Sequence, residues 1–238
     1  MQDDDAAARL EAIRRFYDGE YYRDVPPRAR PSAHHRRLAL RLAVGVQDAV
    51  LDVACGTGGW LAACAERGAA VAGIDLSARA IECCRASLRG GEFHVGPAET
   101  LPFEDERFSI VTCLGSLEHF LDPDAALGAM RRVAQDDARF IILVPNAGFL
   151  TRRLGLFRGT YQTQAREQVL SLAAWQALFE RNGLRVVARW RDLHVLSRDW
   201  ILRPPWSRVP ARAAQALALA CWPLGWQYQV YFECRQTG

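Results

Sequence analysis

Five short runs of mostly apolar residues constrain the fold of this chain more than any other feature. Because they lack polar alternation, each is expected to be a strand buried on both faces, as in a parallel sheet. Segments rich in Ala, Arg and Leu separate them, and strands in alternation with helices predict a doubly wound α/β domain. The runs are Val50–Ala54, Ala70–Asp75, Phe93–Val95, Phe108–Cys113 and Phe140–Val144.

The segments that flank these runs follow other patterns. Leu10, Ile13 and Tyr17 recur at helical spacing and predict an N-terminal helix, and a second helix is expected from about His34 to Val44. Further helices and strands are expected at Leu172–Arg181 (capped by Ser171 and Gly183), Leu184–Trp190, Ala211–Ala220 and Tyr228–Cys234. Two long segments without a strand pattern are typical of lids or binding loops, Pro145–Leu170 and Asp192–Ala211.

The composition fits a single domain with a sizeable core, because half of the 238 residues are hydrophobic. We expect a helical cap over 1–48, a central core over 49–146 and a third part over 147–238. The net charge is only +3 and the arginines are spread along the chain, so no nucleic-acid partner is expected. The basic cluster Arg28, Arg30, Arg36 and Arg37 is interpreted as a solvated helix face.

The cysteines and the N-terminus indicate in which cellular compartment the chain is expected. Seven cysteines without a C-x-x-C pair predict neither a metal site nor a disulfide framework, and the thiols are expected to be buried in a reducing environment. The acidic start of the chain does not resemble a signal peptide, so a cytoplasmic location is expected.

The stretch Ala213–Phe232 has no charged residue, so it has to be considered as a membrane-spanning segment. Pro223 and Gly225 interrupt it, so we interpret it as a helix followed by a buried strand and not as a membrane span. Peripheral contact with lipid remains an alternative on composition alone.

A glycine-rich turn directly after the first strand is the strongest chemical signal. Gly56, Thr57 and Gly58 follow the strand and precede a helix, which favours close approach of a ligand to the backbone. Dinucleotide-binding turns have a third glycine where this chain has Leu61. Asp52 lies where a pyrophosphate would meet the wrong charge, whereas an ammonium group would be favoured. An amino-acid moiety is therefore the better ligand.

Asp75, 19 residues after Gly56, ends the second strand. A carboxylate at this point can accept hydrogen bonds from both hydroxyls of a ribose. The alternative is a turn residue or helix cap, but Ser77 already suits the capping role.

These motifs occur in an order that resembles the class I S-adenosylmethionine-dependent methyltransferase family. The resemblance rests on Val50–Gly58, Gly73–Ser77, Gly96–Phe103 and Phe108–Pro123, within the region from Ala49 to Asn146. It implies a Rossmann-like seven-stranded, mostly parallel sheet with an antiparallel last strand, and S-adenosylmethionine as the cofactor. The small-molecule methyltransferases of the family are the most similar group.

The resemblance also implies roles for individual residues. Gly56, Thr57 and Gly58 would pass under the cofactor, Asp52 would lie near its methionine end, and Asp75 would hold the ribose. Five more residues are expected to contact the cofactor: Ala54, Leu76, Ala98, Glu99 and Leu114. Pro97 stands where many relatives carry an acidic partner of the adenine, so Glu99 is the candidate replacement. Ala54 stands where a glycine is common.

Two further residues are candidates for direct contacts near the reacting groups. His119 follows the fourth strand and could accept a proton from an attacking hydroxyl, or it could merely order the loop. Tyr17 belongs to an aromatic N-terminal segment that, by resemblance, would cover the cofactor; packing of these rings in the core is equally compatible.

The expected reaction is methyl transfer to a small molecule, with weak preference for a hydroxyl of a sugar, quinone, other aromatic or lipid-linked acceptor. Recognition of the acceptor would fall to the variable segments, which contain Trp200, Trp206, Trp222, Trp226, Arg152, Arg153 and Arg203. Three alternatives are an NAD-dependent oxidoreductase, a catalytically silent cofactor-binding scaffold and a methyltransferase of RNA or protein.

Overall fold

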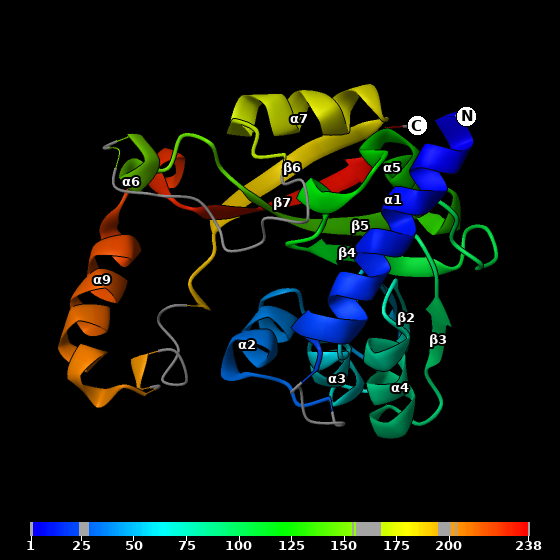
Figure 1. Cartoon of the computed structure of the whole chain (residues 1–238), viewed down its shortest axis with the longest axis horizontal. Coiled ribbons are helices and arrows are strands. Elements are labelled where there is room, and N and C mark those ends of the chain that lie inside the picture. The colour runs from blue at the N-terminus through cyan, green and yellow to red at the C-terminus, as the bar shows by residue number, and fades with distance from the viewer. Residues whose placement is uncertain are drawn as a thin grey trace.

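The computed structural model describes residues 2–23, 29–153, 155, 168–194, 201–202 and 204–237, and for residues 2–7 and 151 the backbone alone. The predicted strands form one seven-stranded sheet in the order β3-β2-β1-β4-β5-β7-β6 (Figure 1). Its strands are β1 (Ala49–Val53), β2 (Ala70–Asp75), β3 (Glu92–Val95), β4 (Phe108–Leu114), β5 (Ala134–Pro145), β6 (Leu184–Arg191) and β7 (Gln229–Gln236). Neighbours from β3 to β5 are parallel, and β7 is antiparallel to β5 and β6. The doubly wound, mostly parallel sheet is thus confirmed.

Helices cover both faces of the sheet. On one face lie α2 (Ala33–Arg41), α3 (Gly59–Ala65) and α4 (Ala78–Ser87), and on the other α5 (Pro123–Val133) and α7 (Leu172–Arg181) (Figure 1). Each face has its own buried cluster: Trp60 and Leu61 of α3 contribute to the first, and Trp175 and Phe179 of α7 to the second. Burial on both faces explains why the central strands are apolar without alternation.

The helix ends follow from local side-chain chemistry. Ser77 accepts a hydrogen bond from the backbone N–H of Ala80 at the start of α4, and Ser171 accepts one from Ala174 at the start of α7, as predicted. β5 begins six residues earlier than the apolar run that predicted it. Its first residue, Ala134, pairs with Phe108 across an irregularity in the ladder, so polar residues at this end are part of the strand.

The N-terminal helix ends sooner than expected. α1 spans Gln2–Phe16, and Tyr17 instead begins the wider π-helical turn η1 (Tyr17–Tyr21). α2 also ends at Arg41 and not at Val44, because Ala43 adopts a positive φ of 53°. The π-helical turn leads the chain to the carboxyl ends of the central strands, whereas the end of α2 leads it to Ala49, the start of β1.

The C-terminal part contains a helix that was expected, with slightly wider bounds. The two ends of α9 (Val209–Cys221) adjoin short 3-10 turns, η4 (Trp206–Arg208) and η5 (Leu224–Trp226). Within the described residues, every helix is too short or too polar to cross a bilayer. Six of the seven thiols are buried, as expected, but Cys221 is exposed at the end of α9.

Ala54 occupies an unfavourable backbone conformation at the end of β1. Its φ is +62°, in the left-handed region where a Cβ is crowded. This geometry explains why glycine is common here in the family that the sequence resembles.

We expect Ala54→Gly to stabilise the protein by about 0.5–1 kcal/mol, because relief of the left-handed strain outweighs the added freedom of the unfolded chain. Urea unfolding measures this free energy. Ala177→Gly, at an exposed position in the middle of α7, is the control and should lose about 1 kcal/mol. Equal losses in both variants would contradict the assignment of strain to Ala54.

Candidate functional site

A cavity of about 470 Å³ opens at the carboxyl ends of β1, β2 and β4, beneath the N-terminal segment. In open α/β sheets, ligands bind at this edge. Ten of the eleven residues predicted to bind the cofactor line it, together with His119; they are Tyr17, Asp52, Ala54, Gly56, Thr57, Asp75, Leu76, Ala98, Glu99 and Leu114. The eleventh, Gly58, lies outside the lining.

The two glycines of the turn have different roles. Both have positive φ, +53° at Gly56 and +78° at Gly58. A Cβ on Gly58 would lie 2.9 Å from the Cys84 sulfur, so this glycine permits close packing against α4. A Cβ on Gly56 would lie 2.9 Å from the Tyr22 hydroxyl, which belongs to the pocket. Only Gly56 therefore leaves room on the ligand side of the turn.

Asp75 joins the end of β2 to the glycine turn. Its Oδ2 accepts a hydrogen bond from the Gly56 N–H (2.8 Å), and its Oδ1 accepts one from the Ser77 N–H (2.9 Å). Burial raises the pKa of this carboxyl, and the two backbone hydrogen bonds oppose that shift. Each carboxylate oxygen has two acceptor sites, so both retain capacity for a ligand hydroxyl.

Asp52, at the end of the adjacent strand, has a different environment. Thr112 donates a 2.5 Å hydrogen bond to its Oδ1, and the indole N–H of Trp60 donates to Thr112 (3.1 Å). Burial raises the pKa of Asp52 to about 7, against the effect of the Thr112 hydrogen bond, and the charge of Asp75 adds to the rise. A buried carboxylate in this position would gain most from a cationic ligand group.

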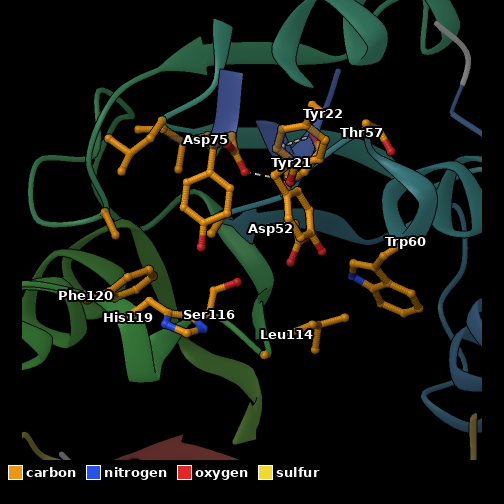
Figure 2. Close-up of a pocket in the computed structure, with 18 of the residues that line it drawn as sticks. Tyr21, Tyr22, Asp52, Thr57, Trp60, Asp75, Leu114, Ser116, His119 and Phe120 are labelled. Carbon is orange, nitrogen blue, oxygen red and sulfur yellow. Dashed lines mark hydrogen bonds between the residues drawn. The ribbon is translucent and has the colours of Figure 1, made fainter. Parts of the chain in front are cut away.

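The N-terminal segment covers the cavity with aromatic rings. Tyr17, Tyr21 and Tyr22 all line it, with ring centroids 4.9–6.2 Å apart. Figure 2 shows Tyr21 and Tyr22 near Asp52 and Asp75. Burial raises the pKa of Tyr17 to about 12, so its hydroxyl stays neutral at physiological pH. Tyr17 thus lines the cavity, and its contact with a cofactor stays a prediction.

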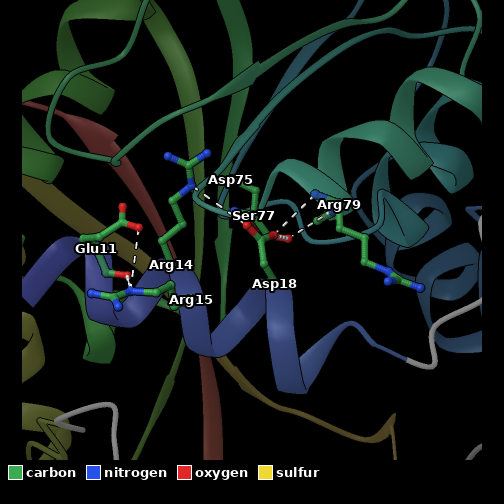
Figure 3. A network of polar contacts seen from close by, with 8 residues as sticks. Glu11, Arg14, Arg15, Asp18, Asp75, Ser77 and Arg79 are labelled. Atoms are coloured by element: carbon green, nitrogen blue, oxygen red, sulfur yellow. Dashed lines mark hydrogen bonds and ion pairs between the residues drawn. The ribbon is translucent and has the colours of Figure 1, made fainter.

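A polar network attaches this segment to the first turn of α4 (Figure 3). The Ser77 hydroxyl donates to Asp18 Oδ1 at 2.5 Å, and the Arg79 N–H lies 3.4 Å from the same oxygen. Asp18 also forms a long ion pair with Arg14 (3.9 Å). Ser77 follows Asp75 by two residues, so the cover and the acidic end of β2 are directly connected.

His119 ends the short turn η2 (Leu117–His119), after β4. In Figure 2 its ring lies beside Ser116 and Phe120, on the opposite side of the cavity from Asp75. His119 also lines a smaller neighbouring cavity formed with Arg9 and Gln168. The histidine is therefore positioned between the main cavity and a second opening, where it could meet a second ligand.

Sequence reasoning missed several residues of the site. Trp60 and His35 come from α3 and α2, whose apolar and basic patterns carry no sign of a cavity. Arg30, interpreted as part of a solvated face, lines the cavity, whereas Arg36 pairs with Glu66 on the surface. Burial lowers the pKa of His35 to about 4, so its ring is neutral at pH 7.

Glu99, the candidate partner of an adenine, already has a protein partner. Its Oε1 accepts a 3.2 Å hydrogen bond from the backbone N–H of Asp122, the cap of α5. Ala98, beside it, is buried in the cavity wall. An adenine contact from Glu99 would have to share this carboxylate, so the role stays a prediction.

Known proteins resemble this chain in sequence over its central part. Residues 51–142 match a family model described as a methyltransferase domain. An uncharacterized methyltransferase, YcgJ, of Bacillus subtilis is 32% identical over 65% of this chain, and a ubiquinone biosynthesis O-methyltransferase of Alkalilimnicola ehrlichii is 38% identical over 66% of it. Each alignment spans 64% of the length of the relative.

Solved structures resemble it over almost the full length. A Haloferax volcanii putative methyltransferase, in complex with the Trm112 activator, has a TM-score of 0.64 at 18% identity, covering 98% of this chain and 97% of its own. The Burkholderia thailandensis 1,6-didemethyltoxoflavin-N1-methyltransferase, with bound S-adenosylhomocysteine, has a TM-score of 0.62 at 17% identity, covering 100% and 90%. At these identities the likeness concerns the fold.

The match to the family model, the identities of 30% and more and the common fold agree with the motif order at the cavity. Residues 51–142 are therefore similar to a methyltransferase domain, and the whole chain has the fold of S-adenosylmethionine-dependent methyltransferases.

Proposed function

We propose that this chain binds S-adenosylmethionine in the described cavity and transfers its methyl group to a small-molecule acceptor. The observation that carries the proposal is the pair of buried carboxylates, Asp52 and Asp75, on the two sides of the glycine turn. One carboxylate suits an ammonium group and the other a ribose. In this cofactor the ammonium group lies at the methionine end, and the ribose lies between the sulfur and the adenine.

The rest of the cavity has the chemistry that the remaining parts of the cofactor require. Leu76 and Ala98 provide apolar surface for an adenine beyond the ribose carboxylate. The tyrosine rings of the cover offer π-faces to a sulfonium, which carries a positive charge. Leu114 lies between the cofactor side and η2 and would help to exclude water from the reacting groups.

Bound S-adenosylmethionine would supply a methyl group on a positively charged sulfur, whose bond to carbon breaks with its electron pair as the acceptor oxygen forms the new bond. His119 would accept the proton that the acceptor hydroxyl loses. The protein otherwise has to align the acceptor and keep water away, which accounts for most of the rate enhancement in such displacements.

We propose a hydroxyl as the methylated group, on a sugar, a quinone or other aromatic, or a lipid-linked metabolite. Support comes from His119 at the cavity and from relatives named as ubiquinone biosynthesis O-methyltransferases. Other relatives carry different names, such as the demethylmenaquinone methyltransferase of Thermotoga maritima, 36% identical over 40% of this chain.

The second candidate is a cofactor-binding protein without methyl transfer. The fold accommodates other activities, because the [4+2]-cyclase SpnF shares it with a TM-score of 0.56 at 19% identity, covering 84% of this chain and 81% of its own. Measured turnover separates the two candidates, whereas cofactor binding is common to both.

Calorimetric titration with S-adenosylhomocysteine should show binding, and titration with NAD should show none. Asp75→Asn is expected to weaken the affinity for S-adenosylhomocysteine by about tenfold or more, since hydrogen bonds to charged groups contribute about 1.5–3 kcal/mol. The amide retains one acceptor for the backbone. Preferential binding of NAD, or an unchanged affinity in the variant, would refute the assignment.

The affinity for S-adenosylhomocysteine should rise with pH up to about 7 and then level off. Below its pKa of about 7, Asp52 is mostly protonated, so ligand binding must first ionise it, and affinity falls by up to about tenfold per pH unit. Asp52→Asn should bind more weakly and with a flatter pH profile, in which only the contribution of Asp75 remains. An equally steep profile in the variant would contradict this role of Asp52.

His119→Ala should lower kcat by about 10²–10³-fold, because a general base contributes on this scale. Its affinity for S-adenosylhomocysteine should change less than about threefold. Turnover is measured with any quinol, phenol or sugar hydroxyl that the unaltered protein methylates. His94→Ala is the matched control, since His94 pairs with Glu92 outside the cavity. Unaltered turnover in the His119 variant would assign this residue a structural role.

A further inference from the structure

The C-terminal helix α9 and its flanking turns expose large apolar side chains to solvent. Leu217 is 70% exposed, Trp206 67%, Leu202 46% and Trp226 39%. We call these four residues the docking face. Isolated exposed apolar residues are common, but a run of them on one helix and its ends indicates an interaction site. Figure 1 shows α9 at one end of the molecule, away from the central sheet.

Two residues of the docking face, Trp206 and Leu217, belong to a stripe of exposed residues along η4 and α9. Trp206, Pro210, Ala213, Leu217 and Cys221 follow one another at intervals of three or four residues, and all five are exposed. Arg212 and Ala216, on another side of the helix, are buried. The helix therefore turns its charged residue inward and an apolar surface outward, the reverse of a solvated helix.

The charge around the docking face has one sign. The sequence contains no Asp or Glu at positions 204–232, the described segment that includes α9 and its flanking turns. The exposed arginines of this segment and of the helix α6 (Leu150–Arg153) are Arg208, Arg152 and Arg153. Within the described part of the chain, Arg152, Arg153 and Arg208 form no ion pair.

The helix α6 (Leu150–Arg153), which carries two of these arginines, is held near η5. Asn146, just before it, donates hydrogen bonds from its amide nitrogen to the carbonyl oxygens of Gly225 (2.9 Å) and Gln227 (3.1 Å). The cationic residues and the apolar face thus belong to one part of the molecule, and Figure 1 shows α6 beyond the C-terminal end of α9.

We propose that the docking face binds the surface of an anionic lipid bilayer, with α9 lying in the plane of the interface. At about 1.5 Å per residue its 13 residues span roughly 20 Å, less than the hydrocarbon core of about 30 Å, so the helix lies on the bilayer and does not cross it. Exposed tryptophans prefer the headgroup boundary, and arginines add attraction to anionic lipids.

A second protein chain is a poorer occupant of this surface. A stable protein interface presents about 20–30 residues a side, whereas the docking face has four large apolar residues. A bilayer needs only shallow insertion of such a stripe. The inference does not rest on methyl transfer, because bilayer binding involves neither the cavity nor a cofactor.

The test is flotation of the full chain with vesicles of phosphatidylcholine alone, and with vesicles in which roughly one third is phosphatidylglycerol. We expect binding to the second only, and loss of most of it in about 1 M salt, where the Debye length falls to about 3 Å. Trp206→Ser with Leu217→Ser, and separately Arg152→Gln with Arg208→Gln, should each lower vesicle partitioning by about tenfold or more.

Matched controls use residues of equal exposure elsewhere. Val46→Ser alters a side chain that is 72% exposed, and Arg89→Gln with Arg185→Gln removes two exposed arginines distant from α9. Both controls should partition like the unaltered chain. Absence of binding to anionic vesicles, equal loss in the controls, or a dimer in size-exclusion chromatography that the Trp206/Leu217 variant abolishes would each overturn the proposal.

Discussion

The hydrogen bonds that Asp75 accepts from Gly56 and Ser77 are the interaction on which the site depends. They tie the carboxyl end of β2 to the glycine turn after β1, so two strand ends and the start of α4 hold one geometry. The carboxylate is buried, and each of these hydrogen bonds to a charged group contributes about 1.5–3 kcal/mol. The same residue that shapes the cavity is the one we propose to recognise a ribose, so fold and ligand binding are coupled there.

The cover of the cavity depends on this junction too. Asp18 accepts from the Ser77 hydroxyl, and Tyr22 lies directly above Gly56, so the N-terminal segment is positioned by residues next to Asp75. Asp52, by contrast, is held by Thr112 and Trp60 from β4 and α3. The two carboxylates thus have separate supports, and a change at one need not displace the other. Burial raises the pKa of each, which makes both sensitive to the charge of a ligand.

Much of the fold and of the cofactor side could be predicted from sequence. The apolar runs predicted the strands because burial on both faces favours apolar residues at most positions. The glycine turn and Asp75 predicted the cavity because they directly follow or end a strand. The end of α1 and the start of β5 were predicted less well. Tyr17 opens a π-helical turn, and Ala134 joins the sheet through pairing with Phe108, and neither effect leaves a periodic pattern.

The sequence by itself determined the sheet, the glycine turn and the two carboxylates, since these follow from local patterns of burial and backbone conformation. Only the tertiary structure decided that Arg30, His35 and Trp60 line the cavity, that Gly58 packs against Cys84 instead, and that α9 presents an apolar stripe outward. Each of these depends on which side of a helix faces another element, and that is fixed by contacts between segments far apart in the chain.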